Sequence, residues 1–251
     1  MKHFLQIYLY LLITFIFSNK VHSQTNTSKW QIGANIGFAV YQGDLTPYRV
    51  GSYKLLKPLI GLDISRIFTP YLKLRTSIAL GQLKGDEGLY VKPPYRKERN
   101  LNFTTSFAEI SEILIWNFLD KSSDINYKRF SPYLFGGVGV SLLDVNRSSS
   151  KTSAAYLLNE TIAAAGLLQD LQTAPPKAIM VFPAGIGVDI YLSPSVSLNG
   201  EINFRYTRTD YLDGFSKIAN PKVNDYFYTN TIGITYKLGK KDLLGCPVLK
   251  L

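Results

Sequence analysis

Apolar residues alternate with small or polar residues along most of the chain. Within residues 30–41, every second position is apolar, and Gly or a polar residue fills most of the positions between. Strict alternation is typical of a β-strand with one apolar face. Seven further segments repeat the pattern, and Glu112 is an exception on the apolar face of its segment. These segments lie near 60–65, 72–80, 108–118, 134–142, 182–190, 196–206 and 226–238. The pattern predicts about eight strands, most near the ten residues that a tilted membrane strand needs.

The connections between these segments differ in length. Residues 68–71 and 192–195 are tight turns that contain Pro, and residues 119–129 are intermediate. Longer loops lie near 42–57, 84–102, 144–177 and 208–225. Short periplasmic turns and longer external loops are typical of outer-membrane barrels. We therefore expect an all-β transmembrane antiparallel barrel. In the third long loop, the Ala/Leu-rich stretch 154–171 is either a short helix over the barrel mouth or, as the plainer interpretation, a flexible loop.

A soluble β-sandwich or lipocalin-like barrel is the alternative to a membrane barrel. Aromatic residues gather at the ends of the predicted strands, as in the girdles of membrane barrels. The second face of the strands is mostly Gly, Ser, Thr and Asn with a few charges of both signs. A soluble sheet would present many Lys and Glu to water there. The composition of this face favours the membrane barrel.

The polar face carries charged residues that we expect to point into the lumen. An eight-stranded barrel has an interior that side chains fill, and buried charges must be paired. We predict a structural charge network of Arg75, Glu109, Glu201 and Arg205, with Asp63 and Asp189 on the same face. The alternative, acid/base chemistry by the carboxylates of Glu109 and Glu201, lacks an open cleft beside them.

The ends of the chain predict an exported protein. Residues 1–23 have a basic start, an apolar core and a small-x-small cleavage pattern, which is typical of a signal peptide. The expected domains are this peptide, the barrel over 24–238 and a periplasmic tail over 239–251. Cleavage removes both histidines, His3 and His22, so it excludes His-based catalysis and His-ligated metals. We expect no catalytic residue, cofactor or small-molecule substrate.

Two features leave room for partners or ions. Cleavage also removes Lys2 and Lys20 and no acidic residue, so the formal charge falls from +10 to +8. The chain has no dense basic run and is predicted to be exported, so we expect its basic charge to meet lipid headgroups, anionic polysaccharide or an acidic protein rather than nucleic acid. The lone Cys246 is either a free thiol or an intermolecular disulfide. Asp210, Asp213 and Asp225 are candidates for a loop calcium site, although their spacing departs from the EF-hand pattern.

Several stretches resemble a known family, the PorG-like outer-membrane proteins of the Bacteroidota type IX secretion machinery. They are YQGDL at 41–45, RNLNFTTSFAEI at 99–110, PYLFGGVGV at 132–140, PAGIGV at 183–188, EINFRYTRTDYLD at 201–213 and Cys246-Pro247. The resemblance implies a barrel in the cell outer membrane that anchors periplasmic ring or lipoprotein components of a secretion complex and is not itself the conduit.

Other functions stay open at this point. A small barrel acting in adhesion or envelope integrity through its external loops is the main alternative. A membrane-embedded enzyme is disfavoured because the mature chain has no His, and a small-solute pore is disfavoured because the lumen is filled.

Overall fold

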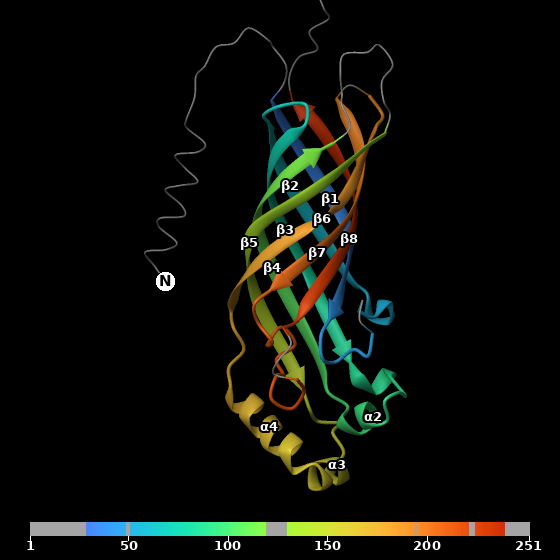
Figure 1. Ribbon diagram of the computed structural model, residues 1–251, viewed down its shortest axis with the longest axis vertical. Helices are drawn as coiled ribbons and strands as arrows, with labels where there is room; N and C mark the ends of the chain where they lie inside the picture. The colour runs from blue at the N-terminus through green and yellow to red at the C-terminus, as the bar shows by residue number, and fades with distance from the viewer. Residues whose placement is uncertain (1–28, 49–50, 119–129, 194, 221–223, 239–251) are drawn as a thin grey trace, which may run out of the picture. The chain divides into compact units, whose positions relative to one another are not determined.

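The computed structural model describes residues 29–48, 51–118, 130–193, 195–220 and 224–238. Within them, eight antiparallel strands form one closed barrel, in which each strand pairs with its sequence neighbours and β8 pairs with β1 (Figure 1). The strands are β1 Trp30–Gln42, β2 Lys57–Ile67, β3 Leu72–Asp86, β4 Asn102–Asn117, β5 Phe130–Ser148, β6 Ala178–Tyr191, β7 Val196–Thr207 and β8 Tyr226–Leu238. The predicted fold class is confirmed.

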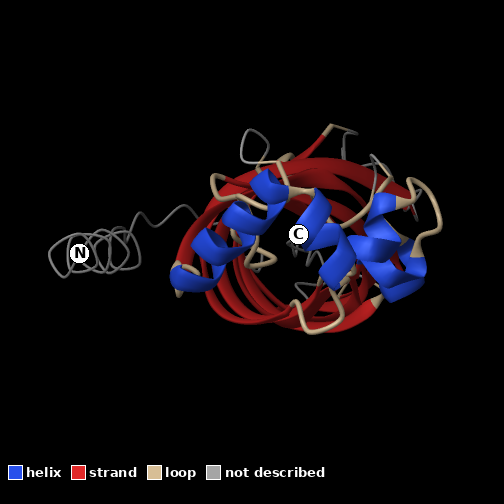
Figure 2. Ribbon diagram, turned by 90° about the horizontal axis from the view of Figure 1, so that it is seen from below, coloured by secondary structure: helices blue, strands red, loops and turns tan. Residues whose placement is uncertain are grey.

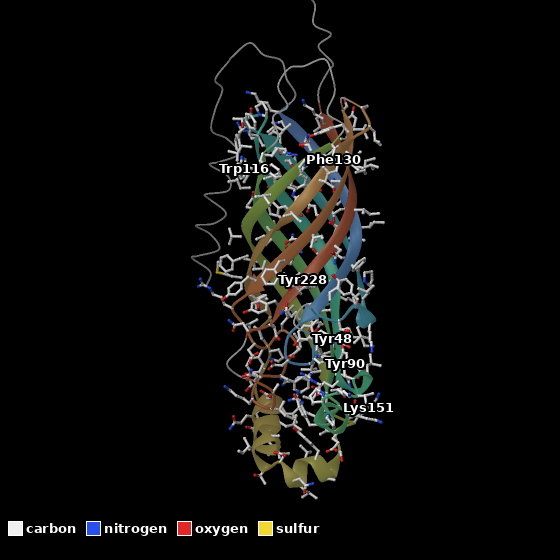
Figure 3. The ribbon with its side chains drawn as sticks, turned by 45° about the vertical axis from the view of Figure 1, so that its right-hand side comes forward. Tyr48, Tyr90, Trp116, Phe130, Lys151 and Tyr228 are labelled. Atoms are coloured by element: carbon white, nitrogen blue, oxygen red, sulfur yellow. The ribbon has the colours of Figure 1, made fainter. Side chains whose placement is uncertain are left out.

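The apolar faces of the strands point outward. Ile36, Leu62 and Ile232 are 60%, 65% and 67% exposed, whereas inward residues such as Thr105 and Ser141 are fully buried. This arrangement is the reverse of a soluble barrel, in which the apolar faces pack inside. Aromatic side chains border the outer apolar surface. Trp116 and Phe130 lie near the end of the barrel that carries the short turns (Figure 3). We call this outer apolar surface the belt.

Several strands are longer than the alternation predicts. They run from 11 to 19 residues, and β5 is the longest. Strands β3 to β5 continue beyond the belt on the side of the long loops, where their outward residues are polar, such as Gln82, Lys84 and Asp144. The second and third long loops are therefore shorter than expected, at 87–101 and 149–177. The strands remain paired there, but they have no apolar outer face from which the sequence pattern could predict them.

The two tight turns lie at the same end of the barrel. In the first turn, the Phe68 amide donates to the Leu72 carbonyl at 3.0 Å, and in the second the Leu192 amide donates to the Val196 carbonyl at 3.0 Å. Strand β1 starts and β8 ends at this end, where Trp30 pairs with Leu238. The predicted connection at 119–129 lies outside the described residues.

Short helices cover the opposite end of the barrel (Figure 2). The helices are α2 Tyr95–Arg99, α3 Ala154–Asn159 and α4 Thr161–Gln172, with 3-10 turns at Tyr53–Leu55 and Glu87–Leu89. The interpretation of 154–171 as a flexible loop is wrong, because α3 and α4 bury Tyr156 and Leu167 against their surroundings. Among the described residues, no helix combines the length and hydropathy needed to cross a bilayer.

Two neighbouring glycines of β5 offer a test of how tightly the strands approach. A Cβ on the inward Gly137 would lie 2.1 Å from the carbonyl oxygen of Glu112 on β4, which is backbone and cannot move aside. A Cβ on the outward Gly136 would have only the Pro183 carbonyl oxygen within 4 Å, at 3.9 Å. Only the first position therefore requires glycine.

We predict that Gly137→Ala destabilises the folded barrel by about 1–3 kcal/mol, because β4 and β5 must separate to admit the methyl group. Urea unfolding followed by heat-modifiable gel migration measures the change. Gly136→Ala is the matched control and is expected to leave the midpoint unchanged. Equal midpoints for the two variants would mean that the β4–β5 approach is looser than described.

Candidate functional site

Arg75 and Glu201 form a two-pronged ion pair across the lumen. Arg75 Nη1 donates to Glu201 Oε1 at 2.5 Å, and Nη2 donates to Oε2 at 3.0 Å. The Tyr133 hydroxyl also donates to Glu201 Oε1, at 2.6 Å. These residues come from β3, β7 and β5, so the contacts tie together strands that are not neighbours in the sheet. A fork-shaped Arg–carboxylate pair fixes geometry as well as charge.

A second ion pair lies nearer the long loops. Arg205 Nε donates to Glu109 Oε2 at 2.8 Å, and Arg205 Nη1 also bonds the Thr229 hydroxyl. The four residues predicted as a lumen network thus form two pairs, each with one Arg and one Glu. The carboxylates of Glu109 and Glu201 each pair with a guanidinium, so they belong to two separate ion pairs.

A third ion pair, between Lys73 and Asp189, does not follow from the sequence pattern. Lys73 Nζ lies 3.1 Å from Asp189 Oδ2, and both side chains are buried. Asp63, predicted on the same face, accepts a long hydrogen bond of 3.5 Å from Asn35. The signal for Lys73 was present, since it occupies a polar position of its alternating segment. Its partner, on the non-adjacent strand β6, cannot be read from alternation.

Apolar side chains fill the lumen on the long-loop side of the ion pairs. Phe107 and Phe227 lie with their ring centroids 5.2 Å apart, and Tyr41 contacts Phe103 edge-on at 4.7 Å. Residues of the fourth long loop enter the same cluster, in which Leu212 and Phe215 are fully buried. The described lumen is therefore filled by a charged layer followed by an apolar layer.

The loops above the apolar layer are joined by buried ionic contacts. Glu87 is fully buried and accepts from Arg96 Nη1 at 3.0 Å and from Arg99 Nε at 2.9 Å. Arg96 also donates to the Asp44 carbonyl at 2.7 Å, and Arg99 donates to the Ile218 carbonyl at 3.0 Å. Two Arg side chains on the short helix α2 thus join the first, second and fourth long loops.

Asp170 joins α4 to the fourth loop. Its carboxylate accepts from the backbone amides of Ser216, Lys217 and Ile218 at 2.9–3.2 Å, and from the Tyr211 hydroxyl at 3.1 Å. Arg147 also bonds the Gly214 carbonyl and donates to the Thr173 carbonyl at 2.8 Å. We call this bonded set of loops and helices the cap, which comprises residues 43–48, 51–56, 87–101, 149–177, 208–220 and 224–225.

The candidate calcium residues make a different cluster. The Tyr41 hydroxyl lies between two carboxylates, 2.6 Å from Asp213 Oδ2 and 2.8 Å from Asp225 Oδ1. Burial raises the pKa of both Asp213 and Asp225 well above the usual range. Neither oxygen of Asp210 has a hydrogen-bond partner within the described part of the chain. Over that same part, no group of three or more His, Cys, Asp or Glu side chains could hold a metal ion.

Comparison with known proteins places this barrel in a family. Residues 6–246 match DUF6089, a domain of unknown function. The chain belongs to the DUF6089 family. No curated protein matches its sequence.

Several solved structures are similar to this DUF6089 protein. Neisserial surface protein A has 14% sequence identity and a TM-score of 0.50, over 85% of this chain and 100% of that one. The attachment invasion locus protein Ail of Yersinia pestis has 10% identity and a TM-score of 0.45, over 84% and 98% of the two chains. The outer membrane protein OprG from Pseudomonas aeruginosa has 13% identity and a TM-score of 0.45, over 87% and 100%. The first likeness agrees with the closed eight-stranded barrel of this chain.

Some predicted features lie outside the described residues of this DUF6089 protein. They are the signal peptide over 1–23, the tail over 239–251 and Cys246. The cap contacts, in contrast, are described but were missed from sequence. A signal for them exists in Arg96 and Arg99, which are spaced three residues apart and therefore share one face of a helix.

We predict that Glu201→Ala lowers the stability of the DUF6089 barrel by roughly 3–5 kcal/mol, because it leaves the Arg75 guanidinium buried without its partner. Urea unfolding of the purified protein measures the loss. The double variant Arg75→Met with Glu201→Leu removes both charges and is expected to recover most of the stability. A single variant as stable as wild type would show that the lumen charges are solvated.

We predict that the cap loosens as pH rises. Burial raises the pKa of Asp210 to about 7, from 3.8, and Asp44 adds to the rise. The closed cap therefore keeps a proton that an open cap releases, so its stability falls between about pH 4 and pH 7. Since Asp210 is half-buried, we expect a loss of only about 1 kcal/mol.

Hydrogen–deuterium exchange of residues 208–220 at pH 5 and pH 8 measures this loosening, after correction for the intrinsic exchange rate. Asp210→Asn is expected to reduce the pH dependence, to which the buried Asp213 and Asp225 also contribute. Asp144→Asn, an outward residue below the cap, should leave the pH dependence unchanged. Protection that rises with pH would contradict the assignment of the retained proton.

Proposed function

We propose that this protein is a structural barrel of the cell outer membrane that anchors periplasmic components of a protein secretion apparatus of the type IX kind. The observation that carries the proposal is the filled lumen. Two Arg–Glu pairs, the Lys73–Asp189 pair and the apolar layer occupy the interior from the short turns to the cap. An eight-stranded interior of this kind offers a rigid support and no passage for cargo.

The outer surface supports the membrane location. Its exposed residues are mostly Ile, Leu, Val and aromatic side chains, and an apolar band with aromatic borders is what a bilayer requires of a barrel. Arg66 stacks near Trp30 and Phe68 at the short-turn end, with distances of 5.8 and 5.5 Å to the ring centroids. Aromatic and basic side chains together suit the headgroup region.

The end of the barrel with the short turns is the proposed docking end. Strand β1 begins and β8 ends there, and we propose that this end of the barrel faces the periplasm. The tail carries Lys240, Lys241 and Cys246 and is the segment that we propose contacts a ring or lipoprotein component. The sequence resemblance to PorG-like proteins supports this choice of partner.

A second candidate function rests on the cap. Val91, Leu158 and Ile162 are apolar and 74%, 79% and 86% exposed on its surface. Exposed apolar residues on a well-packed external surface suit contact with another protein or surface. Adhesion or envelope integrity through the cap is therefore the alternative to anchoring through the tail.

Affinity purification from detergent-solubilised membranes separates the two functions. Anchoring predicts that full-length protein recovers periplasmic ring or lipoprotein components, and that removal of residues 239–251 loses them while heat-modifiable migration is retained. The matched control, Leu158→Ser with Ile162→Ser, alters the cap and is expected to keep those components. The opposite pattern would support the adhesion alternative and reject the anchor.

We also predict that Cys246 forms a disulfide with the periplasmic partner. Lys240, Lys241 and Lys250 are close to Cys246 in the sequence, and basic surroundings favour the reactive thiolate form of a cysteine. Non-reducing gels of membranes, with thiols trapped at lysis, should show a heavier band that disappears with reductant and in Cys246→Ser. A monomer alone in wild-type membranes would reject the covalent link.

A further inference from the structure

The belt contains an acidic residue at its middle. Glu112 points outward from β4 between the exposed residues Ile110 and Leu114, and it lies about halfway between the outward Phe118 and Ala108. A carboxylate that faces lipid is costly, and such residues mark functional sites by default. The sequence pattern already singled out Glu112 as the exception on its apolar face, and neither the lumen nor the cap uses it.

The Glu112 carboxylate uses only part of its hydrogen-bonding capacity. The Thr76 hydroxyl on the adjacent β3 donates to Glu112 Oε1 at 2.6 Å. No hydrogen bond to Oε2 is present within the described residues. A carboxylate accepts up to about four hydrogen bonds, so Glu112 can keep the Thr76 contact and still accept from a donor on another molecule. That molecule must lie in the membrane, because Glu112 faces the belt.

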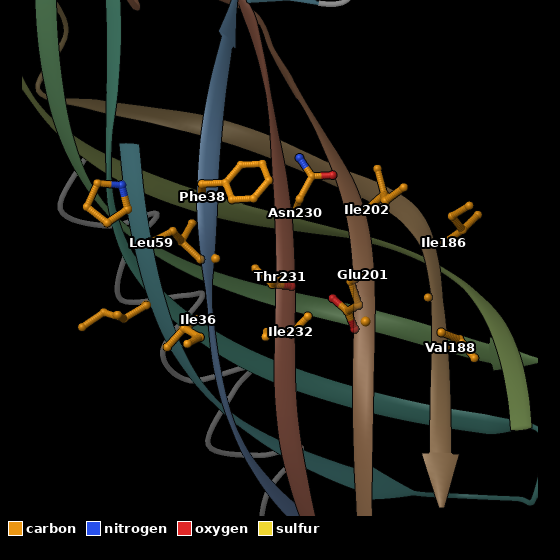
Figure 4. A pocket seen from close by; sticks show the side chains of 15 residues that line it. Ile36, Phe38, Leu59, Ile186, Val188, Glu201, Ile202, Asn230, Thr231 and Ile232 are labelled. Carbon is orange, nitrogen blue, oxygen red and sulfur yellow. The ribbon is translucent and has the colours of Figure 1, made fainter. Parts of the chain in front are cut away.

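The belt of the same barrel also has a groove, of about 780 Å³. Figure 4 shows its lining, which crosses β2, β1, β8, β7 and β6. Two rows of outward residues, defined by the pairing register, border the groove. One row contains Phe38, Asn230 and Ile202, and the other contains Ile36, Ile232 and Gly200. A Cβ on Gly200 would have only Val188 Cγ1 within 4 Å, at 3.9 Å, so the glycine leaves the groove open there.

Asn230 brings an unused donor to this groove. Its Nδ2 is buried and has no hydrogen-bond partner among the described residues. Asn230 points outward from β8, between Phe38 and Ile202 in the register. The terminal torsion of an Asn side chain is soft, so a rotation that turns Nδ2 toward the groove costs little. A buried amide without a partner gains when an acceptor reaches it.

The acceptor, Glu112, and the donor, Asn230, lie on opposite sides of the barrel. Strands β4 and β8 are four positions apart in a closed order of eight, so one barrel cannot bring Glu112 to its own Asn230. A second copy with the same orientation in the membrane can. We propose that copies of this chain associate side by side in the membrane, with Glu112 of one copy accepting a hydrogen bond from the partner's Asn230.

The geometry of this contact determines the assembly. Ile110 and Leu114 flank Glu112 as a ridge, and the groove that Gly200 leaves open receives it. Because the two surfaces differ, the contact is head-to-tail, and each copy still offers one free surface of each kind. The assembly is therefore a row of barrels rather than a closed pair. It requires only that the barrel spans a membrane and is independent of the periplasmic anchoring role.

Site-specific photo-crosslinking in native membranes tests the contact. A benzophenone side chain replaces Leu114 in full-length protein, and the crosslinked peptides are mapped by mass spectrometry. The expected product is a second copy crosslinked through β7 or β8, with trimers at longer exposure. The matched control places the same group at Ile64, an exposed belt residue on β2. Strand β2 lies a quarter of the barrel circumference from β4, so this variant should give no such product.

Two variants then test the hydrogen bond itself. Asn230→Leu is expected to lower the yield of crosslinked dimer by about five- to tenfold, the effect of one polar contact between membrane segments. Exchanging the pair, with Glu112→Asn and Asn230→Glu in one chain, is expected to restore it. Heat-modifiable migration verifies that each variant is folded.

Three results would overturn the proposal. The first is a crosslink from Leu114 only to lipid or to a different protein. The second is a dimer joined through β3 to β5 of both copies, which would be a symmetric contact. The third is an exchanged variant that is folded yet as poorly crosslinked as Asn230→Leu.

Discussion

The pairing of β1 with β8 closes the barrel, and every other feature of this structure presupposes that closure. It joins Trp30 through Gln42 to Leu238 through Tyr226 without a break and so removes both edges of the sheet. A sheet in hydrocarbon has no water to satisfy an exposed edge, so closure is obligatory for a strand-built membrane protein. Closure with eight strands also fixes the diameter, and the remaining choices concern how side chains fill a narrow interior.

The interior is filled by opposite charges near the short turns and by apolar groups near the loops. Arg75 and Arg205 each have a carboxylate partner on a non-adjacent strand across the lumen, and Glu201 accepts from both Arg75 and Tyr133. These contacts act as cross-braces that the sheet hydrogen bonds cannot supply. In the cap, buried carboxylates again join separate segments, since Glu87 and Asp170 accept hydrogen bonds from donors on several loops. Glu112 departs from this pattern, since its charge faces the belt and part of its bonding capacity is unused.

Much of the fold could be predicted from the sequence because alternation is a local property. The eight strands, the tight turns and the inward direction of Arg75, Glu109, Glu201 and Arg205 all follow from period two. The partner of each charge could not be predicted, since Arg75 meets Glu201 through the stagger of β3 against β7, and nothing in either strand encodes that stagger. The extension of β3 past Leu80 was missed because Gln82 and Lys84 are polar on the outer face. The cap was missed for a related reason: the contacts of Asp170 are with backbone amides, which any sequence offers.

Electrical recording distinguishes a sealed barrel from one with an open lumen. Purified, folded full-length protein is inserted into planar lipid bilayers, with a general porin in the same membrane as the positive control. We expect no stable conductance steps from this protein, because charged pairs and aromatic rings occupy the lumen. Reproducible steps of constant size from the wild-type protein would show an open passage, which a filled lumen does not allow.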